Sequence, residues 1–465
     1  MKLNRKRRKT NYSNQKGITL IALVITIVVL LILAGVSINA IFSENGIINR
    51  AKEAQNKMSQ AVENDLKEIN ELSNYLNEIM NNNDRGNTGG DTPTQPVTKL
   101  LITDASLKSN DRTTESQTVI AQDIKGNQVV VPGGFKIADD SGISVEQGIV
   151  IQDGSGNQFV WIPVSNINAD GSNKIKKDDD SEVEITLGRY TFKREQNSET
   201  GLYEDGTSTL VQKGSEYDQT TVAQATSDPK TLDTKYRARS HFYELSDSRT
   251  SNEKDDLTGT NTTAKNLQAF IEKTNTNKGF YIARYEASYR SGYNASGSTT
   301  AEKYGNAKPL SKVSTASSES SMNYVEGTLW NFITQPQAAI VSQNMYKDNS
   351  YVESDLVNSY AWDTAIVYIQ AMGNSNYANA DRGTNTTLMN TGATGDEKCK
   401  IFDMAGNILE WTTEYSIYTN SSNAYSCVGR GSDYNHSFRY TSYNTRNYPT
   451  DKSCYISFRT TFYVK

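Results

Sequence analysis

The N-terminal segment constrains this 465-residue chain more than any other part of it. A leader, residues 1–17, carries Lys and Arg without any Asp or Glu, and an uncharged apolar run follows from Ile18 to Ile41. A run of that length can cross the hydrocarbon core of a membrane as one helix. The basic flank should stay in the cytoplasm, so the sequence predicts a single-pass protein of the cell membrane with its C-terminal domain outside the cell.

The junction between the leader and the apolar run has the form of a processing site. Gly17 and Ile18, in the sequence KGITLI, resemble the cleavage and methylation site of type IV prepilins and pseudopilins. In that family, prepilin peptidase cuts after the glycine, and the apolar helix packs into a pilus or stays in the membrane. Ala22 stands where the family usually has a glutamate that pairs with a neighbouring subunit, which argues against a major pilus subunit. An uncleaved signal anchor is the alternative.

Two segments separate the apolar run from the rest of the chain. Residues 42–80 place apolar side chains at steps of three and four, which predicts an amphipathic stalk helix packed against a partner helix or the C-terminal domain. Residues 81–98 are rich in Asn, Gly, Thr and Pro, which predicts a flexible linker. Residues 99–465 then suffice for one large domain, in which residues 164–278 form a polar insertion.

Composition argues against several classes of function. The net charge of −5 and the lack of a basic cluster beyond the leader argue against nucleic-acid binding. His241 and His436 are too few and too scattered for a histidine-rich metal site. Of the three cysteines, Cys399, Cys427 and Cys454, the last two could pair as a disulfide outside the cell.

Short strands and few helices are expected in the C-terminal domain, which predicts an α+β fold. Strands are expected at residues 128–131 and 279–286 and from residue 456 to the end, with a hairpin formed by residues 148–151 and 158–163. Helices are expected at residues 264–273, 334–342 and 361–372. The last helix should bury Trp362, Ala365, Ile366 and Ile369, and most of the insertion should be surface loops.

One motif points to a known family. Residues 402–412 (FDMAGNILEWT) closely resemble the signature of the formylglycine-generating, sulfatase-modifying-factor family. Further segments resemble family motifs in the same order: residues 159–163, 280–286, 361–372, 430–434 (RGSDY) and 457–459 (SFR). The resemblance covers roughly residues 131–465, apart from the insertion, and implies a C-type-lectin-like fold.

The same resemblance carries expectations for chemistry. The enzymes of this family oxidise a substrate cysteine with two cysteines of their own, whose positions fall at His436 and Thr441 in this chain. Because neither residue is cysteine, we expect no enzyme of that type. In the enzymes the signature turn wraps a calcium ion, which implies Asp403, Gly406, Ile408 and Glu410 as calcium ligands here. Oxygen atoms from a tight turn are the ligands that calcium prefers.

The tail of the domain, residues 432–457, is dense in Tyr, Asn, Ser, Thr and Arg. Such a mixture is typical of binding surfaces in which tyrosines act as rigid anchors. It also resembles the variable region of diversity-generating retroelement targets, which are C-type-lectin-like proteins. The predicted binding residues are Tyr434, Asn435, His436, Phe438, Arg439, Tyr440, Tyr443, Asn444, Arg446, Asn447, Tyr448 and Tyr455.

We therefore predict a surface-displayed, adhesin-like protein that binds an unidentified protein or glycan through these loops. The alternatives are a minor or tip pilin or pseudopilin with a structural role, and an enzyme of the sulfatase-modifying type. Replacing Tyr434, Tyr440 and Tyr443 with Ala should abolish binding by a domain that stays folded. Trp411→Ala should unfold the domain, because removing a large buried aromatic side chain costs about 3–5 kcal/mol.

Overall fold

The computed structural model describes much of the C-terminal part of the chain. The described residues are 100–114, 116–165, 174–210, 267–381, 383–415, 419–420, 423–424, 427–436, 440–442, 444–447 and 451–465. They belong to one compact unit, Pro96–Lys465, and Met1–Gln95 form a second unit. The predicted leader, membrane span, stalk and linker lie outside the described residues. Within the described ranges, no helix has both the length and the apolar character that a membrane span requires.

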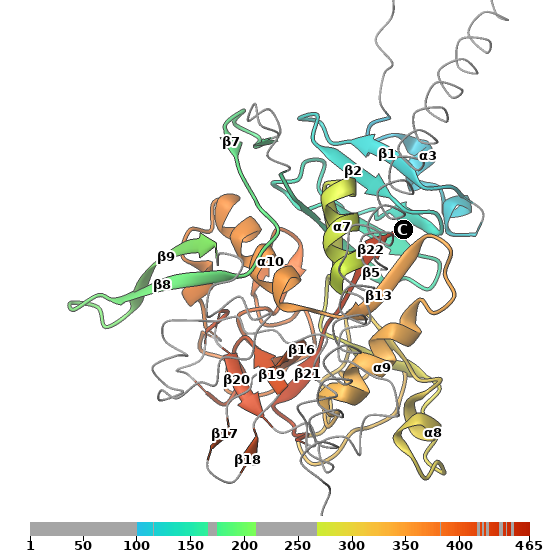
Figure 1. The fold of residues 1–465 in the computed structure, drawn as a ribbon, viewed down its shortest axis with the longest axis vertical. Helices are drawn as coiled ribbons and strands as arrows, with labels where there is room; N and C mark the ends of the chain where they lie inside the picture. Colours follow the sequence, from blue (N-terminus) through green and yellow to red (C-terminus); the bar gives the residue numbers. More distant parts are fainter. Residues whose placement is uncertain are drawn as a thin grey trace, which may run out of the picture. The chain divides into compact units, whose positions relative to one another are not determined.

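An antiparallel sheet forms the centre of the domain (Figure 1). In spatial order its strands are β13 (Val352–Leu356), β22 (Thr460–Val464), β10 (Gly279–Ala283), β5 (Gln158–Pro163), β4 (Val150–Asp153) and β3 (Phe135–Ile137). The predicted hairpin is confirmed, since β4 and β5 pair with Ile151 opposite Phe159. Every residue of β10 is buried, which explains why that strand reads as an unbroken apolar run.

A smaller sheet carries the signature motif and the tail. Its strands, in spatial order, are β20 (Asn444–Asn447), β19 (Cys427–Arg430), β16 (Leu409–Tyr415) and β21 (Ile456–Phe458). Strands β16 and β21 run parallel, with Trp411 opposite Phe458. The predicted C-terminal strand is therefore divided at Arg459, because β21 belongs to this sheet and β22 to the central one. Figure 1 shows the smaller sheet at the end of the domain away from β1 (Val119–Gln122) and β2 (Gln128–Val131).

Helix α9 (Gln335–Met345) begins at a capping box. The Thr334 side chain accepts a hydrogen bond from the Gln337 main-chain N–H, and the Gln337 side chain accepts one from the Thr334 N–H. A proline in the first turn adds to this signal. The predicted start at residue 334 is thus confirmed to within one residue, and the helix runs three residues beyond the predicted end.

Helix α10 (Ser359–Ala371) begins two residues before the predicted start, because Asn358 caps its first turn. It ends before Gly373, whose φ of +101° is a conformation that glycine adopts readily. The four side chains predicted to be buried are all fully buried. Helix α7 (Leu267–Asn277) extends four residues past the predicted end, and residues 264–266 lie outside the described ranges.

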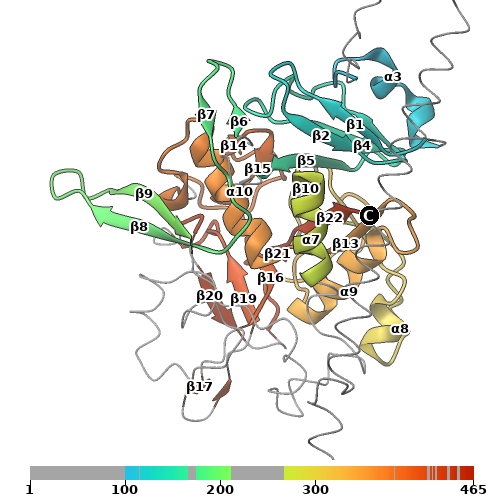
Figure 2. The same ribbon diagram turned by 45° about the horizontal axis from the view of Figure 1, so that its top comes forward.

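The prediction of surface loops for the insertion is wrong in its first half. Residues 174–210 contain the short pair β6 (Ile175–Lys176) and β7 (Glu182–Val183) and the longer hairpin β8 (Tyr190–Gln196) and β9 (Tyr203–Leu210). The hairpin was missed because its strands are mostly polar, and only Tyr190, Phe192 and Gly206 of it are buried. Figure 2 shows this hairpin projecting beside α10. Residues 211–266 lie outside the described part of the chain.

Shorter elements complete the description. The remaining helical turns are α3 (Ala105–Lys108), η1 (Asn110–Thr113), α8 (Thr300–Tyr304) and η2 (Tyr377–Asn379). The remaining strands are β11 (Ser288–Ser291), β12 (Lys308–Leu310), β14 (Glu397–Lys398), β15 (Ile401–Phe402), β17 (Thr419–Asn420) and β18 (Asn423–Ala424). They pair as β11–β12, β14–β15 and β17–β18.

The apolar side chains form two cores. One includes Trp161 and Trp362 and packs around the central sheet, α7 and α10. The other includes Trp330 and Trp411 and packs between α9 and the smaller sheet. All four tryptophans are fully buried, so the prediction that Trp411 is a core residue is confirmed.

Candidate binding site beside the C-terminal loops

A buried ion pair joins the signature motif to the last strand. Arg459 Nη2 lies 2.6 Å from Glu410 Oε1, and Arg459 Nε lies 2.9 Å from Glu410 Oε2. The same guanidinium donates to the main-chain oxygens of Ala283 and Phe402, each at 2.8 Å. Both charged side chains are almost fully buried, so the pair ties the two sheets together at the point where β21 becomes β22.

Polar side chains also hold the signature turn. Asp403 and Asn407 have φ values of 64° and 62°, a conformation that Asp and Asn tolerate better than most residues. Asn407 Nδ2 donates to Glu286 Oε2 at 2.6 Å, while the Asp403 carboxylate accepts from the Gly392 N–H and the Thr394 hydroxyl. Burial raises the pKa of Asp403 to about 6 and holds that of Glu286 well above its ordinary value. These motif residues therefore fix the conformation of the turn within the fold.

A second buried charge cluster fixes the point at which the tail leaves β19. Arg430 Nε forms an ion pair with Glu414, and Arg430 Nη2 lies 3.0 Å from Glu414 Oε1. On the other side, Arg430 Nη1 lies 3.3 Å from Asp363 Oδ1 on α10. All three side chains are fully buried. The segment that follows Arg430 thus starts from a rigid base formed by one helix and one sheet.

The structure places the predicted binding residues in different environments. Tyr434 and Tyr440 are only 4% and 2% exposed, so the expectation that both are surface anchors is wrong. Asn435 is exposed, and His436, Asn447 and Tyr455 are partly exposed. The other predicted residues lie outside the described part of the structure, either entirely or in their side chains: Phe438, Arg439, Tyr443, Asn444, Arg446 and Tyr448.

The β8–β9 hairpin explains the burial of Tyr440. The guanidinium carbon of Arg194 lies 3.7 Å from the centre of the Tyr440 ring and 3.4 Å from that of Tyr203. The cation is therefore held between two aromatic faces. Asn379 Nδ2 secures the hairpin further by donating to main-chain oxygens of β8 and β9. No sequence signal marks Arg194 or Tyr203 for this role, because the contact joins segments that are far apart in the chain.

Three predicted binding residues, His436, Asn447 and Tyr455, come together at one pocket of about 310 Å³. His436 Nδ1 lies 2.8 Å from Oδ1 of the buried Asp433, which orients the imidazole ring. The ring centres of His436 and Tyr455 are 5.9 Å apart. The rest of the lining is Leu409, Trp411, Asp451, Lys452, Ser453 and Ile456. The pocket thus combines three aromatic side chains, His436, Tyr455 and Trp411, with an amide and charges of both signs.

Comparisons with known protein families match both the C-terminal domain and the N-terminal segment. Residues 218–462 match the family described as the sulfatase-modifying factor enzyme 1-like domain. The chain belongs to this family. Residues 12–38 match the prokaryotic N-terminal methylation motif, so the prediction of a prepilin-like N-terminus is confirmed. The crystal structure of CarF is similar at 13% identity and a TM-score of 0.29, covering 40% of this chain and 88% of that chain. No curated protein matches the chain.

The cysteines of this sulfatase-modifying factor-like domain lie in separate environments. Cys427 is buried, with its thiol 3.5 Å from Gln335 Oε1, and it forms no disulfide with Cys454. Burial raises the pKa of Cys399 to about 12, which keeps its thiol protonated at neutral pH. At the second position expected for a catalytic cysteine, the Thr441 hydroxyl is buried and donates to a main-chain oxygen.

The two carboxylates expected to bind calcium are already bonded within the domain. Both Glu410 oxygens accept hydrogen bonds from Arg459, and both Asp403 oxygens accept hydrogen bonds from protein donors. A cation would have to displace the buried guanidinium to reach Glu410. Across the described ranges, His, Cys, Asp and Glu form no group of three that could hold a metal ion. The two carboxylates are thus explained by the fold alone.

Proposed function

We propose that this protein is displayed at the cell surface or on a pilus, and that its C-terminal domain binds a ligand there. The methylation motif supports the location, since proteins with that motif are exported on an apolar N-terminal helix. The observation that carries the binding function is the pocket at which His436, Asn447 and Tyr455 meet. The composition of the tail and its resemblance to variable regions predict these three residues as binding residues, and the fold gathers them from three separate segments.

The pocket suits a polar ligand with a flat or apolar face, such as a peptide or glycan segment. Tyr455 and His436 offer aromatic surface, while Asn447, Asp451 and Lys452 offer donors and acceptors of hydrogen bonds. A few such side chains usually account for most of the binding free energy of a protein surface. The buried Asp433 keeps His436 in place before any ligand arrives, which lowers the entropic cost of binding.

We also propose that the domain lacks the chemistry of a formylglycine-generating enzyme. His436 and Thr441 supply no thiol, and Cys399 has a pKa unsuited to thiolate chemistry. Incubating the full-length protein with copper and a cysteine peptide bearing a sulfatase motif should leave the peptide mass unchanged. Conversion of that cysteine to an aldehyde would favour the enzyme alternative.

The proposal that the tail is diversified predicts a particular gene neighbourhood. A reverse-transcriptase gene should lie nearby, with a second copy of the coding stretch for residues 432–457 that differs at adenines. Neighbouring genes for pilus assembly, without such a repeat, would instead favour a minor pilin with a structural role.

A photo-crosslinking experiment tests the location of binding. Tyr455 and, as a control, Val313 are each replaced with a benzophenone amino acid in the full-length protein on intact cells. Val313 is 64% exposed and does not line the pocket. We expect a cross-linked adduct at position 455 that His436→Ala removes, and none at position 313. The binding proposal fails if position 455 gives no adduct, or only the adducts that position 313 gives.

A further inference from the structure

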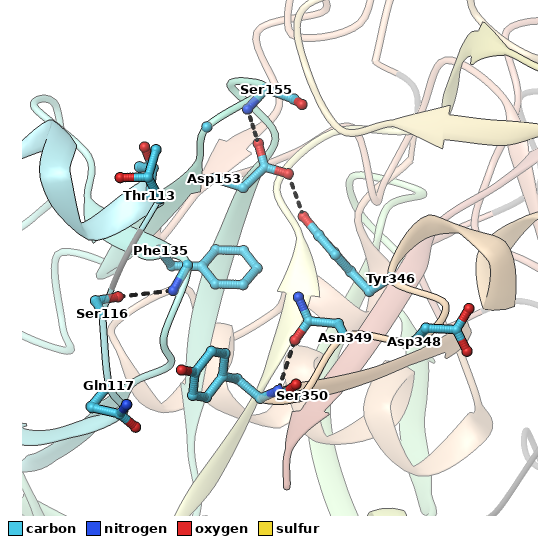
Figure 3. Close-up of a pocket in the computed structure, with 14 residues that line it drawn as sticks. Thr113, Ser116, Gln117, Phe135, Asp153, Ser155, Tyr346, Asp348, Asn349 and Ser350 are labelled. Carbon is cyan, nitrogen blue, oxygen red and sulfur yellow. Dashed lines mark hydrogen bonds between the residues drawn. The ribbon is translucent and has the colours of Figure 1, made fainter.

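A second and larger groove lies beside β3, the edge strand of the central sheet. Its volume is about 980 Å³, and its walls are η1, the turn between β4 and β5, and the loop from α9 to β13 (Figure 3). None of its lining residues lines the pocket beside the C-terminal loops. A ligand bound here would therefore use a different set of side chains from those of the proposed function.

The chemistry of the lining excludes most ligand classes. Its described residues include Asp153 and Asp348 but no Lys, Arg or His, and the neighbouring Arg112 and Lys465 donate to main-chain oxygens of Gln117 and Asn349. A phosphate or carboxylate ligand would therefore meet two aspartates and no cationic side chain among the lining residues. A bare cation is also a poor fit, since the Asp153 carboxylate already accepts from the Ser155 N–H and the Tyr346 hydroxyl. Several hydroxyls of the lining already donate within the protein, as those of Thr113, Thr114 and Tyr346 do. A wholly apolar ligand would still leave the side-chain amide of Gln117 without a partner.

Two amides offer donors that the described structure leaves unused. Asn349 Oδ1 accepts from the main-chain N–H groups of Tyr351 and Val352, at 2.8 and 3.0 Å, which fixes the orientation of its amide. Its Nδ2 then points into the groove between Phe135 and Tyr346 (Figure 3). Within the described residues, neither this nitrogen nor the exposed Gln117 side chain has a hydrogen-bond partner.

Aromatic side chains supply the other half of the surface. Tyr346 and Tyr351 are partly exposed and line the groove among the hydroxyl and amide groups. The buried Phe135 packs against Tyr346 with ring centres 5.4 Å apart, which holds the Tyr346 ring in place. An aromatic surface beside fixed amides and hydroxyls matches a sugar ring, which has an apolar C–H face and hydroxyls that both donate and accept.

We propose that this groove binds a neutral glycan segment. Hydroxyls of the sugar replace water at Asn349 Nδ2 and Gln117, and a C–H face of the sugar packs on the tyrosine surface. The protein would then bind two ligands at independent sites, one at the C-terminal loops and one at this groove.

The test uses full-length, detergent-extracted protein on an array of neutral oligosaccharides and their sialylated or phosphorylated counterparts. Gln117→Ala removes an exposed side chain that has no partner in the described structure. We expect binding to a neutral oligosaccharide, weakened about fivefold by this variant, since one hydrogen bond contributes about 1 kcal/mol. Thermal melting of Gln117→Ala should match that of the wild type.

The paired control is His436→Ala, which alters the C-terminal pocket alone and should leave glycan binding unchanged. Binding that His436→Ala removes and Gln117→Ala spares would place the glycan at the C-terminal pocket and overturn the proposal for the groove. Absence of any neutral ligand, or preference for the anionic counterparts, would overturn it as well. Failure of the groove proposal would leave the expected cross-linked adduct at position 455 unchanged, so the two proposals can fail separately.

Discussion

At the scale of single residues, the most recognisable part of this sequence serves the fold. Asp403, Asn407 and Glu410 belong to the signature, and each is buried and bonded to another part of the domain. The signature therefore identifies the architecture without identifying an activity. Tyr434 and Tyr440 are buried as well. Replacing either with alanine would therefore remove packing contacts inside the domain, and a loss of binding could reflect a loss of folding. His436 and Tyr455 are the better positions for testing binding.

The buried carboxyl of Asp403 should make stability depend on pH. Its pKa is raised from 3.8 to about 6, so its contribution to folding stability is fully present below about pH 3.8 and is lost as pH rises through about 6. Asp403→Asn retains an acceptor for the Gly392 N–H and cannot ionise. Between pH 4 and pH 8, the free energy of unfolding should shift by on the order of 2 kcal/mol in favour of the variant. Urea denaturation at several pH values measures this shift.

Asp179→Asn is the control for that prediction. The hydrogen bonds from Ser181 lower the pKa of this exposed carboxyl, so its stabilising contribution is present at neutral pH and lost as pH falls. Its variant should lose stability relative to the wild type as pH rises, which is the opposite sign. A stability difference for Asp403→Asn that does not vary with pH would contradict the assigned pKa.

At the scale of elements, the β8–β9 hairpin is the part of the fold that reaches the tail. Arg194→Met keeps much of the side-chain volume but removes the cation between Tyr203 and Tyr440. We expect faster hydrogen exchange in β8 and β9 and a loss of about 1 kcal/mol in the free energy of unfolding, the size of a partly exposed cation–π contact.

A neighbouring lysine provides the matched control for the hairpin. Lys193→Met lies on the same strand and removes ion pairs from Lys193 to Glu195 and Asp205, whose side chains lie partly in solvent. Exposed pairs contribute little, so this variant should exchange like the wild type. Equal exchange rates in the two variants would show that the cation between the rings does not hold the hairpin.

At the scale of the whole molecule, the prepilin-like motif suggests a membrane or pilus-associated location for the domain. The methylation motif at residues 12–38 predicts cleavage between Gly17 and Ile18, followed by methylation of the new N-terminus. Mass spectrometry of membrane-extracted protein should find a mature chain that begins with methylated Ile18. Gly17→Glu should retain the leader. An intact Met1 in the wild-type protein would contradict processing and favour an uncleaved signal anchor.

The sequence alone determined the elements whose signals are local. The capping box at Thr334, the turn between β4 and β5 and the apolar run of β10 each act over a few residues, so their positions were predicted to within a few residues. The prepilin-like motif and the signature at residues 402–412 were recognisable for the same reason.

Only the tertiary structure decided which side chains meet. Arg459 neutralises Glu410, Arg194 covers Tyr440, and His436, Asn447 and Tyr455 share a pocket, each through contacts between segments distant in the chain. No local pattern records such contacts, because they depend on how two sheets and an inserted hairpin pack. Burial follows from that packing, and it changed two tyrosines from expected binding anchors into core residues.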